Sequence, residues 1–250
     1  MKKIFIFTIA SFMLLQCSIT DVSANGRSPA DEPLIPGKQS SISEKAFKVI
    51  KEEIGIKEGD STEQIIEKIF IWQKTAFTHE HLGGELIGKR TIEEIIAERT
   101  MSGCHDDALL FSGVLRRYDS PALMVDTVEL KWVREYRNNK KLMIVRGHVF
   151  VEANINKQCI LIDSSSGEYT FDYKPTHKFI PFQLEKTGGY YVMFRGLDTD
   201  GYGVADNEDL RSKLKTFANN FSEKSISFPS YEIHTIPFND TNPITDSETQ

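Results

Sequence analysis

The spacing of apolar residues changes once along the chain, near residue 120. Before that point they recur every three or four positions, as at Phe47, Ile50 and Ile54, which predicts amphipathic helices. Beyond it apolar and polar residues alternate, which predicts half-buried strands at 123–130, 142–153, 158–163 and 190–194. Helices followed by antiparallel strands predict an α+β fold. A chain of 250 residues with 40% hydrophobic content supports one main domain.

Capping signals place the starts of the early helices. Three capping-box pairs are present: Ser41 with Glu44, Ser61 with Gln64, and Thr91 with Glu94. Gly55 is expected to end the first of these helices. A fourth helix, from Cys104 to about residue 118, is apolar on most sides and is therefore expected in the middle of the domain.

The N-terminus has the pattern of an export signal. Lys2 and Lys3 precede an apolar run at 4–15 that is short for a membrane span. Two processing sites remain open: cleavage after Ala24, or cleavage before Cys17, which would then carry a membrane-attaching lipid. We expect an exported protein of the periplasm or cell envelope.

Composition then divides the rest of the chain. Residues 1–24 form the signal segment, and 25–40, with three prolines and two glycines, are expected to form a flexible tether. A domain at 41–222 precedes a C-terminal extension and polar tail at 223–250.

Charge and cysteine content exclude several classes of protein. The net charge of −6 and the scattered lysines and arginines argue against nucleic acid as a partner. Of three cysteines, Cys17 belongs to the signal region, which leaves Cys104 and Cys159. Two cysteines are too few for a disulfide framework, although one bridge between them remains open. No cofactor motif is present.

Cys104 follows Gly103 at the first turn of the predicted buried helix. The free amides and partial positive charge of a helix N-terminus favour a thiolate over a thiol. A cysteine that is merely a small core residue is the alternative. Cys104 is therefore a candidate nucleophile.

A hairpin is predicted to bring His148 and Asp163 together. Strands 142–153 and 158–163 flank a polar turn, and a two- or four-residue loop makes paired residue numbers sum to 311. His148 would then face Asp163 directly, close enough for the carboxylate to hold the ring. A three- or five-residue loop would put them on opposite faces. The same register pairs Phe150 with Leu161 and Glu152 with Cys159.

These segments resemble the transglutaminase-like superfamily of papain-fold thiol enzymes. The matching segments are Gly-Cys-His-Asp-Asp-Ala at 103–108, Gly-His-Val-Phe-Val-Glu at 147–152 and Leu-Ile-Asp-Ser-Ser at 161–165. Cysteine, histidine and aspartate follow the family's order, and the resemblance covers about residues 60–170. It implies a papain-like core in which the nucleophile helix packs on an antiparallel sheet.

The resemblance also implies a catalytic triad that acts on protein or peptide substrates. Cys104 would attack a carboxamide or peptide carbonyl, His148 would relay protons, and Asp163 would orient His148. Family members include proteases, amide hydrolases and acyltransferases. The chain departs from the pattern at His105, where animal transglutaminases have an aromatic residue. No obvious side-chain donor for the oxyanion stands beside Cys104, so its backbone amide is one candidate and the second is unidentified.

Two other kinds of protein remain open. One is a binding module that keeps the fold and holds a peptide in its groove without catalysis, and the other is a structural protein of the cell envelope. The presence of all three residues, Cys104, His148 and Asp163, favours the enzyme, because a binding module has no need of all three.

Two weaker patterns could ligate metals, although we expect no metal at either. Residues 198–209 resemble a calcium loop, but Tyr202 replaces an oxygen ligand, which favours a metal-free acidic turn that caps a helix from Asn207. His79 and His81 have no further ligand at a recognisable spacing, which favours a solvated loop.

Overall fold

The computed structural model describes residues 36–80, 84–142, 144–223 and 226–238. The predicted signal segment, Cys17, His81, the tether up to residue 35 and the polar tail from residue 239 lie outside the described residues. The helices are α1 (Glu44–Ile54), α2 (Thr62–Ala76), α3 (Ile92–Glu98), α4 (Cys104–Arg117), α5 (Leu130–Asn138), α6 (Leu184–Thr187) and α7 (Asn207–Asn220).

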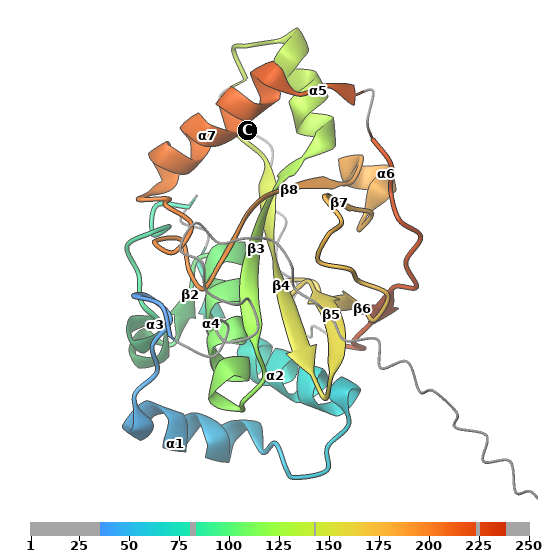
Figure 1. The fold of residues 1–250 in the computed structure, drawn as a ribbon. Coiled ribbons are helices and arrows are strands. Elements are labelled where there is room, and N and C mark those ends of the chain that lie inside the picture. Colours follow the sequence, from blue (N-terminus) through green and yellow to red (C-terminus); the bar gives the residue numbers. More distant parts are fainter. Residues whose placement is uncertain (1–35, 81–83, 143, 224–225, 239–250) are drawn as a thin grey trace, which may run out of the picture.

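One antiparallel sheet organises the domain. Its strands, in the order β7-β8-β3-β4-β5-β6-β9, are β7 (Phe179–Ile180), β8 (Tyr190–Gly196), β3 (Ala122–Glu129), β4 (Gly147–Ile155), β5 (Gln158–Ile162), β6 (Glu168–Thr170) and β9 (His234–Thr235). A separate parallel ladder joins β1 (Thr78–His79) to β2 (Thr100–Met101). Helices α1 and α2 lie at one end of the molecule, and α5 and α7 lie together at the other (Figure 1).

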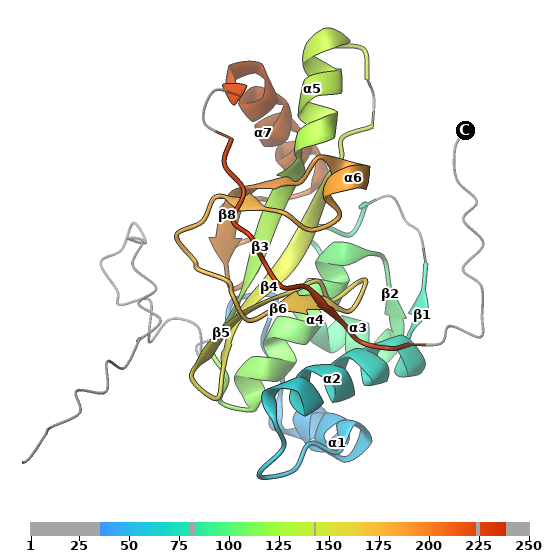
Figure 2. The same ribbon diagram turned by 90° about the vertical axis from the view of Figure 1, so that its right-hand side faces the viewer.

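Helix α4 packs on the centre of this sheet, as predicted. Leu110 and Val114 of α4 share a buried cluster with Val149 and Val151 of β4. Figure 2 shows α4 alongside the long central strands, with α2 and α3 outside it. The arrangement confirms the predicted α+β fold, in which the helix that begins at Cys104 packs on an antiparallel sheet.

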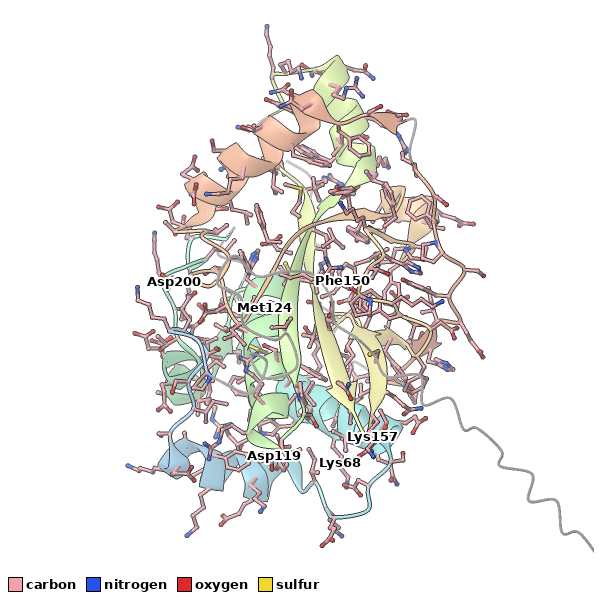
Figure 3. The ribbon with its side chains drawn as sticks, in the orientation of Figure 1. Lys68, Asp119, Met124, Phe150, Lys157 and Asp200 are labelled. Atoms are coloured by element: carbon pink, nitrogen blue, oxygen red, sulfur yellow. The ribbon has the colours of Figure 1, made fainter. Side chains whose placement is uncertain are left out.

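Apolar side chains on the two faces of the sheet form separate cores. On β3, Met124 belongs to the cluster around α4, and Val128 belongs to the one beneath α5 and α7. Phe150 lies with Val125 in a third cluster on the opposite face. Figure 3 labels Met124 and Phe150 on either side of the central strands. Asp126 lies between Met124 and Val128 on the face that the helices cover.

Capping chemistry explains most helix ends. Ser61 and Thr91 each form a full capping box, as predicted. Gly55 ends α1 in a left-handed conformation, also as predicted. The start of α1 was predicted two residues too early, because its N-cap is Ser43 and not Ser41. Ile42 is buried in the core, which holds the chain extended up to Ser43.

Two elements differ from the sequence prediction between residues 130 and 147. Helix α5 was not predicted, although it buries Leu130, Trp132, Val133 and Tyr136 on one face. The strand predicted from residue 142 begins only at Gly147. The chain before it supports α5, because the Trp132 Nε1–H donates to the Ile144 carbonyl at 2.8 Å.

The hairpin β4–β5 corrects the predicted register. Val151 pairs with Ile162 and Ile155 with Gln158, so paired numbers sum to 313 and the turn is Asn156-Lys157. Figure 3 labels Lys157 at the tip of this hairpin. The predicted direct pairing of His148 with Asp163, Phe150 with Leu161 and Glu152 with Cys159 is therefore wrong by two residues. Both turn residues have positive φ, which is the conformation that two-residue hairpin turns require.

A shift of two residues preserves the face on which each side chain lies. Side chains alternate with period two along a strand, so only an odd shift would separate His148 from Asp163. They become diagonal neighbours, and imidazole and carboxylate still meet. The prediction that they share a face is confirmed.

Segments at both ends of the described chain join the domain. Gln39 and Ser40, at the end of the predicted tether, are buried, and the Gln39 N–H donates to Asp198 at 2.7 Å. At the other end β9, within the predicted C-terminal extension, pairs with β6 through Tyr169 and His234. The ordered structure therefore begins before residue 41 and includes residues beyond 222.

We expect Asp198→Ala to destabilise the protein by about 3–6 kcal/mol, because it removes two charged hydrogen bonds that contribute roughly 1.5–3 kcal/mol each. Asp198 is buried and accepts backbone N–H groups from Gln39 at 2.7 Å and Gly201 at 2.9 Å. Asp200→Ala is the matched control, because this exposed residue only faces Lys38. Urea unfolding measures both variants, and equal losses would contradict the assignment.

Candidate active site

Cys104 stands at the first position of α4 because of an unusual turn before it. Gly103 has φ 136° and ψ −163°, a region that only glycine enters without strain. The Cys104 N–H has no acceptor within the helix, because the first amides of a helix are unpaired. Cys104 is partly exposed and carries a free thiol, so the bridge to Cys159 that the sequence left open does not form.

Asp106 fixes the turn that presents Cys104. Its Oδ2 accepts the Ser102 N–H and the Ser102 hydroxyl, each at 2.9 Å. The same oxygen accepts Arg90 Nη1 at 3.0 Å, and both side chains are buried. An ion pair with several hydrogen bonds can persist in a core, since the remaining polar atoms are satisfied.

His148 and Asp163 form the pair that the sequence predicted. His148 lies near the start of β4, and its Nε2 is 2.8 Å from Asp163 Oδ1. Asp163 follows β5 and is 1% exposed, and the same oxygen also accepts the Ser165 and Ser166 amides at 3.0 and 3.2 Å. Because Nε2 contacts Asp163, Nδ1 is the ring nitrogen of His148 that is available to the thiol.

Aromatic packing and a second aspartate hold this pair in place. The His148 ring lies edge-on to Phe150, with centroids 4.9 Å apart, and beside Tyr190 at 5.8 Å. Asp107, one turn after Cys104, accepts the Ser165 hydroxyl at 2.6 Å. Helix α4 is thus connected directly to the loop that carries Asp163.

A second histidine–carboxylate pair, which the sequence did not predict, reaches the same thiol. His105 Nε2 lies 2.9 Å from Asp126 Oδ2, and His105 Nδ1 lies 3.9 Å from Cys104 Sγ. The Tyr202 hydroxyl donates to the same Asp126 oxygen at 3.2 Å. A signal was present in the sequence, because Asp126 interrupts the apolar run of 122–128 and is 1% exposed.

The two imidazoles determine the charge of the thiol. Burial opposes ionisation, but hydrogen bonds and positive charge from His105 and His148 outweigh it and lower the pKa of Cys104 to about 6. Burial also opposes the charged form of His105, yet the Asp126 carboxylate raises the His105 pKa to about 10. At neutral pH the site therefore holds a thiolate next to imidazolium.

The pKa of His148 is raised well above its ordinary range, because the Asp163 carboxylate outweighs the effect of burial. The pKa of Asp163 is lowered in turn, since the charge and hydrogen bond of His148 overcome its burial. Asp163 is therefore ionised wherever the thiolate exists, and it can hold the protonated ring.

The acidic loop of 198–209 uses its carboxylates internally. Asp198 accepts backbone amides, and Asp206 caps α7 by accepting the Asp209 N–H at 2.9 Å. The helix that was predicted from Asn207 is confirmed. Within the described residues, no group of three or more histidine, cysteine, aspartate or glutamate side chains is arranged to hold a metal. His79 is described, with its Nδ1 3.9 Å from Asp107, whereas His81 is not.

Comparisons with known proteins add little to this geometry. No protein-family model and no curated protein matches the chain. Among solved structures, the chain is similar to "a Putative Cysteine Protease" from Cytophaga hutchinsonii, with 20% sequence identity and a TM-score of 0.47. The match covers 69% of this chain and 48% of that chain, so this chain spans about half of its neighbour's length. A likeness of this size carries no argument about activity.

The lowered thiol pKa predicts reactivity in mild acid. Alkylation of Cys104 by iodoacetamide should rise with pH around a midpoint of about 6, because the thiolate forms above the pKa. His148→Ala should move the midpoint upward, since it removes a hydrogen bond and a positive charge. Rates measured against pH, with Cys104→Ala as background, test this. A wild-type midpoint near the ordinary value of about 8.5 would contradict it.

Proposed function

We propose that this protein is a thiol hydrolase or acyltransferase that acts on carboxamide or peptide bonds through Cys104, His148 and Asp163. The observation that carries the proposal is a thiol at a helix N-terminus whose pKa is lowered to about 6 beside an imidazole that a buried carboxylate orients. These are the parts that nucleophilic acyl transfer requires.

The chemistry runs in two stages. Cys104 Sγ attacks the carbonyl carbon, and the electron pair of the carbonyl moves to its oxygen. The bond to the leaving nitrogen then breaks as protonated His148 gives that nitrogen a proton, which leaves a thioester on Cys104. Water or an amine, deprotonated by His148, attacks the thioester and regenerates the thiol. Asp163 fixes the ring and stabilises the imidazolium.

Loss of the triad should remove activity in a graded way. Cys104→Ala should abolish turnover, and His148→Ala should lower it by about 10³-fold or more, because nucleophile and base act as a unit. Asp163→Asn should leave more activity, since the thiolate survives. The assay is release of p-nitrophenol from p-nitrophenyl acetate, followed by mass spectrometry of a peptide mixture for cleavage, deamidation or amine incorporation.

The matched control for His148→Ala is His177→Ala, because His177 stacks on Tyr231 away from the site. Melting temperatures show whether each variant folds. A folded Cys104→Ala variant with unchanged turnover would end the enzyme proposal. A wild-type protein that binds peptides without turnover would favour a binding module.

We also propose that the protein is exported, because Lys2 and Lys3 precede an apolar run. The described residues include no helix long and apolar enough to cross a membrane. Intact mass of the protein from the cell envelope should show cleavage, either before a lipid-bearing Cys17 or after Ala24. Cys17→Ala should release the protein from membranes only in the first case. An unprocessed chain that remains in the cytoplasm would refute export.

A further inference from the structure

The pair formed by His105 and Asp126 reproduces the atoms of the pair formed by His148 and Asp163. In both, Nε2 contacts a buried carboxylate, at 2.9 Å for His105 and 2.8 Å for His148. In both, the bond to the carboxylate leaves Nδ1 for the thiol. The two-stage chemistry proposed above transfers protons through one imidazole, that of His148. Beyond its effect on the thiol pKa, the second pair has no role in that chemistry.

The second pair is built to hold a charged ring in one orientation. Asp126 is 1% exposed within an apolar strand, where a lone carboxylate is costly. Tyr202 donates a second hydrogen bond to this carboxylate, and its ring stacks on Phe194 with centroids 5.5 Å apart. Because Asp126 occupies Nε2, the Nδ1 of the protonated ring carries a hydrogen toward the reaction centre.

The two rings are anchored on opposite faces of the sheet. Asp126 pairs with Val149 and Thr127 pairs with His148, so Asp126 and His148 occupy successive register positions. Asp126 faces the helices, whereas His148 lies with Phe150 on the other face. Two imidazoles held from different faces can serve different atoms of one substrate.

The position of His105 suits the carbonyl oxygen of a substrate. After Sγ attacks, this oxygen is two bonds from the sulfur, and His105 Nδ1 is 3.9 Å from the sulfur. An effective oxyanion donor stands about 2.7–3.1 Å from the oxyanion, and His105 Nδ1 is close enough to the sulfur to reach that distance. The Cys104 N–H, unpaired at the start of α4, adjoins it on the same turn of chain.

We propose that His105 is a catalytic residue that donates its Nδ1–H to the oxyanion formed when Cys104 attacks a carbonyl. The Cys104 N–H is the other donor, and Asp126 and Tyr202 are positioning residues. No proton is transferred in this step: the negative charge on oxygen is held by two N–H groups until the carbonyl reforms and the leaving group departs. This inference rests on the proposed function.

Two reactions of the same thiol separate an oxyanion donor from a group that merely ionises Cys104. Acylation by p-nitrophenyl acetate passes through an oxyanion, whereas alkylation by iodoacetamide displaces iodide and forms none. Both rates are measured against pH for the wild type and His105→Ala, and their plateaus, where the thiol is fully ionised, are compared. Cys104→Ala provides the background for both reactions.

We expect His105→Ala to lower the acylation plateau by about 10²–10³-fold, the effect of losing one oxyanion donor. Its alkylation plateau should be unchanged or rise by up to about tenfold, because a less acidic thiol is the better nucleophile. His105→Gln, which keeps an N–H donor without the charge, should recover part of the acylation rate. His177→Ala should change neither plateau.

Plateaus that change together, in the same direction and by similar factors, would overturn the donor role of His105. A glutamine variant that acylates no faster than the alanine variant would also count against it. A wild-type protein that is alkylated but releases no Cys104-dependent p-nitrophenol would refute the proposed function itself. Failure of the proposed function is therefore distinguishable from failure of the donor role of His105. Melting temperatures of the variants show whether each one is folded.

Discussion

The site depends on two consecutive buried aspartates in the first turn of α4. Asp106 ties the helix to the preceding turn and to Arg90, which fixes where Cys104 begins. Asp107 accepts Gln73 of α2 at 2.9 Å and Ser165 of the loop after β5 at 2.6 Å. One helical turn therefore positions Cys104, the helix α2 that packs beside it and the loop that carries Asp163. A change at either aspartate would disturb groups that are far apart in sequence.

The sequence predicted the parts of the fold that follow from local periodicity and capping. The capping boxes at Ser61 and Thr91 depend on side chains three residues apart, which the sequence shows directly. The box predicted at Ser41 failed because burial of Ile42 moves the start of α1 to Ser43. The shared face of His148 and Asp163 was also predictable, since any even number of residues in the hairpin turn places both side chains on the same face. Their diagonal offset was not, because the turn at Asn156-Lys157 depends on positive φ values that several residue types adopt.

The second histidine–carboxylate pair could not be derived from spacing. His105 is on a helix, Asp126 on a strand and Tyr202 on a loop. Only the packing of α4 against β3, together with the pairing of β3 with β8, brings them together. The one local signal was a carboxylate inside an apolar strand, which marks a buried polar contact without naming its partner. Helix α5 was missed for a related reason. Its apolar residues lie on one face of a short helix, and packing against α7 stabilises it more than its own sequence does.

The outer strands of the main sheet bear on how the protein behaves in concentrated solution. An edge strand exposes unpaired backbone groups that another chain can extend, which is a common start of aggregation. Here the sheet ends in β7 on one side and β9 on the other, each only two residues long. The long, apolar strands β3 and β4 are paired on both sides. The strands most able to recruit a second molecule are thus enclosed within the sheet. Among the described residues β7 pairs only with Tyr190 and Tyr191 of β8, so the remainder of β8 up to Gly196 is the border at which another chain could add a strand.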